Sequence, residues 1–288
     1  MSTIAAEQVK ELREQTGLGM MDCKKALAET GGDMSKAIEF LRKQGAAVAA
    51  KRSGRDAKEG KVLLFKDDKI VLAVDINCET DFVAASNDFT KFSNQVVAAI
   101  IKEKPADVAS LNKLSIDGNT IEELNTAIMA KLGENITVRR FAFEELGVND
   151  YAETYSHMGG KIGVIIKLSA SQPFEKSEKL ETFAKDLTMQ VAASNPISID
   201  AEGIPQDLLD KEKEIYRELA LKEGKPEEFV DKIVDGRINK FYKENCLNKQ
   251  VFIKDSKLTV EKLIEQTANE LKIKKLKISV FHRLQLGQ

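Results

Sequence analysis

The chain has 288 residues, a length that suggests about two domains and is ample for a buried core. Hydrophobic residues make up 42% and charged residues 31% of it, a balance that indicates a folded globular protein and excludes wholesale disorder. Lysine and arginine (44) nearly balance aspartate and glutamate (46). The resulting net charge of -2 argues against a dedicated nucleic-acid-binding protein, which usually has a basic excess.

Residues 1–46 are predicted to form three short helices. Asp22 opens the second helix, and Gly31-Gly32 ends it because glycine tolerates the left-handed conformation of a helix C-cap. Asp33 and Ser35 are alternative N-caps for the third helix. The apolar faces of the three helices are Val9, Leu12, Cys23, Ala26, Leu27, Ala37, Ile38 and Leu41. Because so small a bundle buries little apolar area, we expect its function to be docking onto another structure.

Residues 47–60 combine charge with small side chains and are predicted to be a solvated linker. The basic residues of this segment are Lys51, Arg52, Arg55 and Lys58. A phosphate-binding tail is the alternative. The linker is favoured because Asp56 and Glu59 interrupt the positive charge and no aromatic residue is interleaved.

Much of the remaining chain is predicted to be an internal repeat with the order β-β-α-α-β. The first copy consists of strands 62–65 and 70–76, helices 88–101 and 121–132, and strand 136–143. The second consists of strands 153–157 and 162–168, helices 178–193 and 260–271, and strand 274–281. Local similarities support the duplication: Phe89-Thr-Lys resembles Phe183-Ala-Lys, and Ile121-Glu-Glu-Leu resembles Val260-Glu-Lys-Leu. This order predicts two sheets, each covered by helices on one face.

An insertion interrupts the second copy. Half of residues 206–245 are charged, and the Gly224-Lys225-Pro226 break separates two helical stretches. Apolar seams are predicted at Leu208, Ile215 and Leu219 in the first helix and at Val230, Val234 and Phe241 in the second. The pattern indicates an antiparallel helical hairpin with a coiled-coil seam. An interaction role is favoured over an ordinary surface helix pair, because two helices alone bury little area.

The glycine-rich segment Gly159–Gly163 is predicted to be a tight turn between strands. It lacks the spacing, and the Ser or Thr after the lysine, of a phosphate-binding loop. His157 lies beside this turn. A surface or packing role is favoured for it, with a contact at a protein interface as the alternative.

Histidines and cysteines are scarce: the chain has only His157, His282, Cys23, Cys78 and Cys246. We therefore expect no metal site, no cofactor and no histidine-based catalytic set, and we interpret Cys23 and Cys78 as buried thiols. The few, scattered cysteines, the lack of an apolar run of about 20 residues and the acidic N-terminus predict a cytoplasmic protein without membrane contact.

The segment Asn77–Ala84 is the most unusual, because a polar loop with an aromatic residue follows an apolar strand. The favoured interpretation is that Phe82 packs into the local core while Thr80 or Asp81 caps a turn. The alternative is a protruding aromatic anchor beside a carboxylate, a combination found at interface hot spots.

Two long segments resemble signatures of the bacterial elongation factor Ts family, the nucleotide exchange factors of elongation factor Tu. They are LREQTGLGMMDCKKAL (residues 12–27) and NCETDFVA (residues 77–84). Shorter matches occur at His157 and at residues 162–164, 224–226 and 236–237, so that the resemblance extends from residue 4 to about residue 284.

The resemblance implies an α+β protein made of a three-helix, ubiquitin-associated-like bundle, a core of two repeated subdomains and an inserted coiled-coil hairpin. The expected parts are the bundle and linker (1–56), the first core subdomain (57–146), the second core subdomain (147–205 and 247–288) and the hairpin (206–246). Many members have a further C-terminal helical module. Because this chain ends soon after its last predicted strand, we do not assign that module's contacts to it.

The resemblance also implies elongation factor Tu as the partner, in its GDP-bound and nucleotide-free forms, and no direct contact with nucleic acid. The implied contacts to the GTPase domain are Arg13, Met20, Met21 and Lys24. The implied effector residues, which disturb magnesium coordination in the partner, are Thr80, Asp81, Phe82 and Val83. His157 is expected to touch a β-barrel domain of the partner, and the hairpin to serve homodimer contacts. The alternative function is an adaptor without exchange activity, which would not need the Thr80–Val83 segment.

Overall fold

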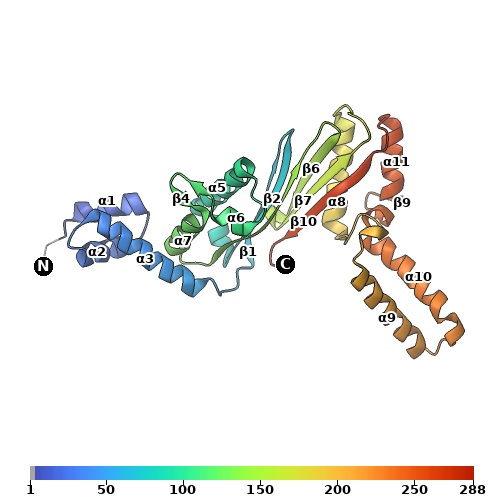
Figure 1. Cartoon of the computed structure of the whole chain (residues 1–288), viewed down its shortest axis with the longest axis horizontal. Coiled ribbons are helices and arrows are strands. Elements are labelled where there is room, and N and C mark those ends of the chain that lie inside the picture. Colours follow the sequence, from blue (N-terminus) through green and yellow to red (C-terminus); the bar gives the residue numbers. More distant parts are fainter. Residues whose placement is uncertain (1–3) are drawn as a thin grey trace.

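Three parts follow one another along an elongated molecule: an N-terminal helical bundle, a central pair of sheets and a projecting helical hairpin (Figure 1). The computed structural model describes residues 4–288. It combines helices with antiparallel sheets, so the protein belongs to the α+β class. Within the described residues, no helix is both long and apolar enough to cross a membrane.

The N-terminal bundle consists of α1 (Ala6–Thr16), α2 (Met20–Glu29) and α3 (Met34–Arg52). Its small core contains every apolar residue predicted for it, with Ile38 only partly buried. Asp33 rather than Ser35 caps α3, accepting a hydrogen bond from the Lys36 amide at 3.0 Å. Helix α2 begins at Met20, two residues before the predicted Asp22, which instead lies in the first turn, where the helix dipole favours a carboxylate.

The prediction of a linker over residues 47–60 is wrong for its first half, because α3 continues to Arg52. Alanine is the strongest helix former, and residues 46–50 include four alanines. One of these, Ala49, also packs against the core of the first sheet. The irregular connection is therefore only a few residues long, and a single helix joins the bundle to the central sheets.

The first sheet has the strand order β1-β2-β5, all antiparallel. Its strands are β1 (Glu59–Lys66), β2 (Ile70–Cys78) and β5 (Ile136–Glu145). Helices α5 (Asn87–Glu103) and α7 (Ile121–Leu132) supply apolar residues to the core on one face of it. The smaller elements of this part are α4 (Asp81–Ala84), α6 (Val108–Asn112), β3 (Ser115–Ile116) and β4 (Asn119–Thr120).

The second sheet has the order β10-β7-β6, which is the same arrangement of first, second and last strand. Its strands are β6 (Asp150–His157), β7 (Ile162–Ser169) and β10 (Lys277–Gln285). They pack against α8 (Glu178–Ser194) and α11 (Val260–Glu270). A short hairpin of β8 (Val251–Phe252) and β9 (Asp255–Thr259) precedes α11. The last strand lies three to four residues later than the predicted 274–281.

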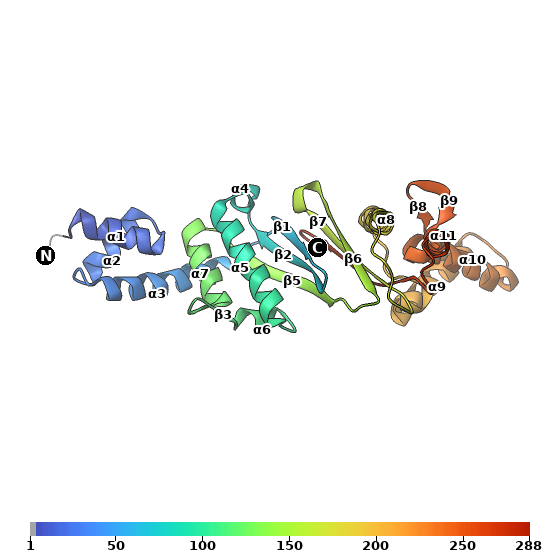
Figure 2. The same ribbon diagram turned by 90° about the horizontal axis from the view of Figure 1, so that it is seen from above.

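The two sheets pack face to face, with their helices outside, so the centre of the molecule has four layers (Figure 2). The apolar residues between the sheets are Val62, Leu64, Val71, Ala73, Ala142, Leu146, Ala152, Ile165, Leu284 and Leu286. At Gly163 the sheets approach so closely that an added Cβ would lie 2.3 Å from Cγ1 of Val62. A glycine at this position therefore permits the contact.

The hairpin pairs α9 (Gln206–Lys222) with α10 (Glu227–Asn245). The seam predicted for α10 is buried, with Ile238 added to it. The seam predicted for α9 is wrong at Ile215 and Leu219, which are 48% and 42% exposed. Leu208 is partly buried against the hairpin core, and Leu209 and Ala220 are buried. The buried residues of α9 thus lie one position after the predicted ones, with Ala220 buried in place of Leu219. The apolar pattern of the sequence did not indicate this, because it favours a leucine over an alanine as the buried residue.

Candidate partner-binding site

Strand β2 leads directly into the Thr80–Val83 turn. All nine residues of this strand are buried, and it pairs with β1 on one edge and β5 on the other. The turn therefore begins from a firmly fixed strand. The Thr80 side chain caps the single-turn helix α4, accepting a hydrogen bond from the Val83 amide at 3.4 Å. The prediction that Thr80 or Asp81 caps a turn is confirmed for Thr80.

Phe82 projects from this turn and is 84% exposed. The favoured interpretation, that it packs into the core, is therefore wrong. In a single helical turn only one side faces the protein, and here Val83 and Ala84 occupy it: Val83 packs against the first core and Ala84 is 5% exposed. Asp81 is exposed beside Phe82. A carboxylate and an aromatic ring are thus presented together to the solvent.

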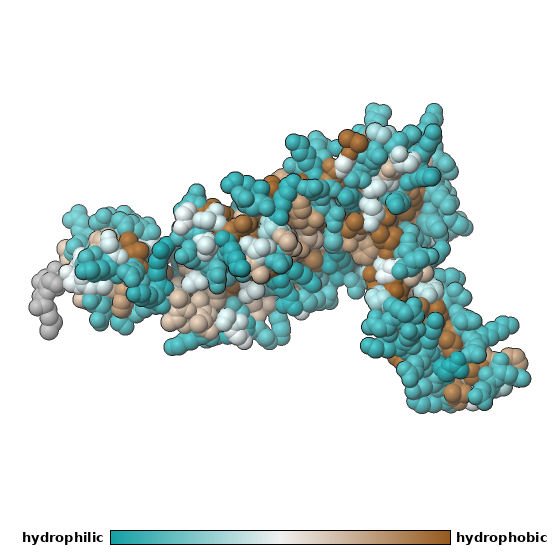
Figure 3. All heavy atoms as spheres, viewed as in Figure 1, coloured by the Kyte–Doolittle hydropathy of each residue, from teal (hydrophilic) through white to brown (hydrophobic). Residues whose placement is uncertain are grey.

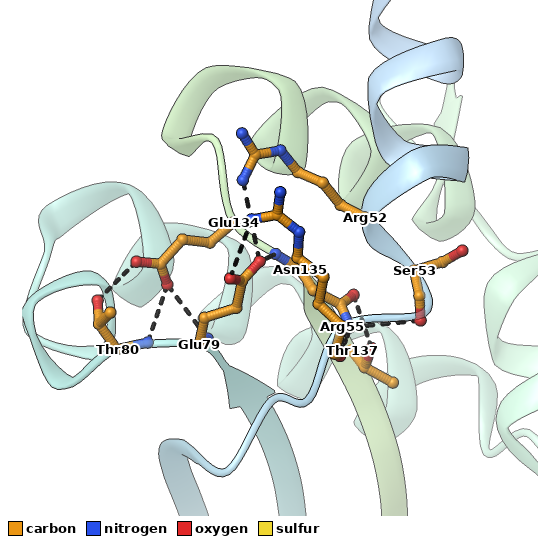
Figure 4. Close-up of polar contacts among 8 residues, drawn as sticks. All are labelled: Arg52, Ser53, Arg55, Glu79, Thr80, Glu134, Asn135 and Thr137. Atoms are coloured by element: carbon orange, nitrogen blue, oxygen red, sulfur yellow. Dashed lines mark hydrogen bonds and ion pairs between the residues drawn. The ribbon is translucent and has the colours of Figure 1, made fainter.

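The carboxylate of Glu134, in the connection between α7 and β5, holds the start of the turn (Figure 4). One of its oxygens accepts hydrogen bonds from the amides of Glu79 and Thr80, at 3.1 and 3.0 Å. The other accepts the Thr80 hydroxyl at 2.6 Å. Hydrogen bonds to an ionised group are stronger than neutral ones, so this carboxylate is the main polar contact of the turn.

Glu79 and Asn135 extend the contact to the end of α3 (Figure 4). The Asn135 amide donates to Glu79 at 2.7 Å, and the Asn135 side chain donates to the Arg55 carbonyl at 2.7 Å. The guanidinium of Arg55 lies 3.4 Å from the Glu79 carboxylate, and that of Arg52 lies 3.9 Å from it. Arg52 and Arg55, which were predicted to lie in a solvated linker, therefore support the turn.

These supporting residues were not predicted from the sequence. Carboxylates are abundant, and no spacing pattern marks a contact between two turns that lie more than fifty residues apart. The available signal was weak: Gly133 ends α7 in the left-handed conformation, which places Glu134 immediately after a helix C-cap.

Cys78 closes the strand below the turn and is fully buried. Its thiol donates to the Thr80 carbonyl at 3.1 Å. Burial, and secondarily the charge of Glu134, raises the pKa of this thiol to about 12. The residue is therefore a buried structural thiol, as predicted, and unsuited to act as a nucleophile.

His157 lies at the same end of the central layers as the Thr80–Val83 turn. Its turn is anchored to β1 by an ion pair between Lys161 and Glu59 at 3.2 Å, and Glu59 is the register partner of Cys78. His157 is exposed, and its Nδ1 lies 3.0 Å from the Tyr155 hydroxyl. The neighbouring Met158 is 66% exposed. The glycine-rich segment is the predicted tight turn: Met158–Gly160 connects β6 to β7.

The remaining predicted contact residues lie on the bundle, away from this end of the sheets (Figure 1). Met20 and Met21, at the start of α2, are 56% and 73% exposed. Lys24 follows one turn later on the same helix, and Arg13 lies in the last turn of α1; both are exposed. The structure therefore presents two separate surfaces, one on the bundle and one at the end of the sheets. Among residues 4–288, no His, Cys, Asp and Glu side chains form a group of three suited to a metal ion.

Comparison with known proteins identifies the family. The sequence profile described as "Elongation factor TS" matches residues 79–288. The chain is 47% identical to elongation factor Ts of Clostridium kluyveri over 291 residues, covering 99% of this chain and 93% of that protein. It is 46% identical to elongation factor Ts of Chlorobium chlorochromatii over 294 residues, covering 100% of both chains. The resemblance inferred from the two signature segments is thus confirmed, and the chain belongs to the elongation factor Ts family of translation elongation factors.

Proposed function

We propose that this chain promotes GDP release from elongation factor Tu in the cytoplasm, acting by binding alone, and so allows GTP to load. Its membership of the elongation factor Ts family supports this proposal. The single observation that carries it is the exposure of Phe82 on a turn that hydrogen bonds to Glu134 hold in place. An aromatic side chain exposed this far is available for burial in a partner.

The Thr80–Val83 turn would act at the partner's nucleotide site. Phe82 would enter a pocket beside the bound GDP, and Asp81 would redirect polar contacts around it. Magnesium requires near-ideal octahedral geometry, so a small displacement of its supporting groups weakens the hold on the nucleotide phosphates. No covalent bond is made or broken in this process.

Two further surfaces would provide affinity away from the nucleotide. Arg13, Met20, Met21 and Lys24 would contact the GTPase domain, which fits the two exposed methionines on α2. His157 would contact a β-barrel domain of the partner from the second core subdomain. In this division of labour, residues 1–56 dock, 57–146 carry the effector turn, and 147–205 with 247–288 form the second contact.

The hairpin, residues 206–246, would mediate a homodimer. Its helices leave large apolar side chains exposed, and apolar atoms reach the surface along it (Figure 3). These residues are Ile215, Leu219, Leu221 and Phe229, which are 42% to 51% exposed. Exposed apolar patches of this kind commonly mark surfaces that are buried when two proteins associate.

Release of a fluorescent GDP analogue tests the proposal. Elongation factor Tu loaded with the analogue is mixed with excess unlabelled GDP, with and without micromolar concentrations of this chain. Acceleration that increases with the concentration of the chain is the expected result. Release at the spontaneous rate would refute exchange activity and leave the adaptor function as the alternative.

A further inference from the structure

We infer that Glu134 is the positioning residue of the exchange reaction: its carboxylate holds the Thr80–Val83 turn in the form that presents Phe82. The inference rests on the proposed exchange function. It concerns a residue that would not touch the partner itself, because Glu134 is partly buried behind the turn that it holds.

The turn needs an external support because α4 has only four residues. A helix this short has almost no stability of its own, since its first hydrogen bonds do not compensate for ordering the backbone. The cap from Thr80 to the Val83 amide is long, at 3.4 Å. Contacts with the rest of the protein must therefore order it: Val83 and Ala84 pack against the core, and Glu134 provides the polar contact.

Glu134 provides that contact at three donors within two consecutive residues. The backbone amides of Glu79 and Thr80 lie just beyond the last residue of β2, and both donate to the same Glu134 oxygen. The Thr80 hydroxyl donates to the other oxygen at 2.6 Å. This arrangement fixes both the backbone direction after β2 and the rotamer of the capping side chain.

An ionised carboxylate suits this position and an amide does not. The carboxylate has acceptors only, whereas a glutamine side chain would direct an NH2 group toward one set of donors. Glu134→Gln keeps the size of the side chain, so it removes the acceptor pattern with little change in packing. Glu122→Gln, on the exposed face of α7, is the matched control because it makes the same chemical change without touching the turn.

Amide hydrogen exchange of the free protein, followed by NMR, tests the positioning role without the partner. Because the amides of Glu79 and Thr80 depend on this carboxylate, each should exchange about tenfold faster in Glu134→Gln, the loss expected for a charge-assisted hydrogen bond. The amides of buried strand β2 should keep their rates, which shows that the fold is intact. Unchanged protection of the Glu79 and Thr80 amides in Glu134→Gln would overturn the inference.

The GDP-release assay then tests the consequence for exchange. The second-order rate constant should fall about tenfold in Glu134→Gln and stay at the wild-type value in Glu122→Gln. A folded Glu134→Gln protein with loosened amides and wild-type exchange would also overturn the inference. Failure of the wild-type chain to accelerate release would instead refute the proposed function, so the two failures are distinguishable.

Discussion

Phe82→Ala is the most direct perturbation of the proposed effector. The phenylalanine is 84% exposed in the free protein, so its ring contributes little to the folded core. Substitutions at such surface positions usually change the free energy of unfolding by less than about 0.5 kcal/mol. The variant should therefore fold and melt like the wild type, and any loss of exchange must arise in the complex.

The magnitude follows from the area left to bury. Because Phe82 keeps most of its surface in the free chain, nearly its full burial energy is available on binding, about 1.5–3 kcal/mol for a phenylalanine side chain. With about 1.4 kcal/mol for each factor of ten, the second-order rate constant of GDP release should fall about 10- to 100-fold. The bundle and the His157 turn would remain available, so binding should weaken without being abolished.

The assay compares fluorescent GDP release for the wild type, Phe82→Ala and Val148→Ala. Val148 is 83% exposed and lies in the connection between the two sheets, away from the Thr80–Val83 turn. It controls for the loss of an exposed apolar side chain as such. Wild-type exchange by a well-folded Phe82→Ala protein, or an equal loss in Val148→Ala, would refute the anchor role of Phe82.

Three further predictions concern the architecture. Replacing residues 207–244 by a short linker should preserve most GDP-release activity and abolish any dimer in sedimentation velocity; near-complete loss of exchange in the folded variant would contradict a hairpin that serves dimerisation. Gly163→Ala should lower the free energy of unfolding in urea by about 1–3 kcal/mol, because the new methyl group would overlap Val62, and an unchanged midpoint would show that the sheets can separate freely there. Burial raises the pKa of Asp75 against the opposing charge of Arg140, so its contribution to stability is present at acid pH and is lost as the pH rises through the raised value. Asp75→Asn should therefore gain stability relative to the wild type as the pH rises above about 4, the ordinary pKa of an aspartate, and a difference in urea denaturation that stays constant with pH would contradict the linkage.

Local pattern predicted the elements well because each has a strong periodic signal. The predicted helix 121–132 coincides with α7, and most other boundaries lie within a few residues of those observed. The errors occur where two signals compete. In residues 47–52 charge suggested solvent while alanine favoured helix, and the helix formed because Ala49 also found a packing surface.

The site was less predictable because its geometry depends on contacts between distant segments. The family signature identified the Thr80–Val83 segment, but the side that faces the core is decided by how α4 leaves β2. Phe82 is of an apolar residue type that usually lies in the core, but it is exposed at the surface. The contacts among Glu79, Glu134 and Asn135 join segments that are far apart in the sequence and meet only in the folded sheet. Local sequence patterns therefore do not predict them.

The separation of the exposed surfaces has an energetic consequence for exchange. By linkage, the factor by which this chain weakens GDP binding equals the factor by which GDP weakens binding of the chain. A turn that competes with the nucleotide therefore cannot also provide the affinity for the GDP-bound partner. That affinity must come from surfaces that the nucleotide does not oppose. The exposed Met20 and Met21 are the proposed ones, and α3 holds their bundle apart from the Thr80–Val83 turn (Figure 1). An elongated molecule with the proposed effector at one place and the proposed docking contacts at another would meet both requirements, since the distant contacts would retain the partner while Phe82 would set the coupling.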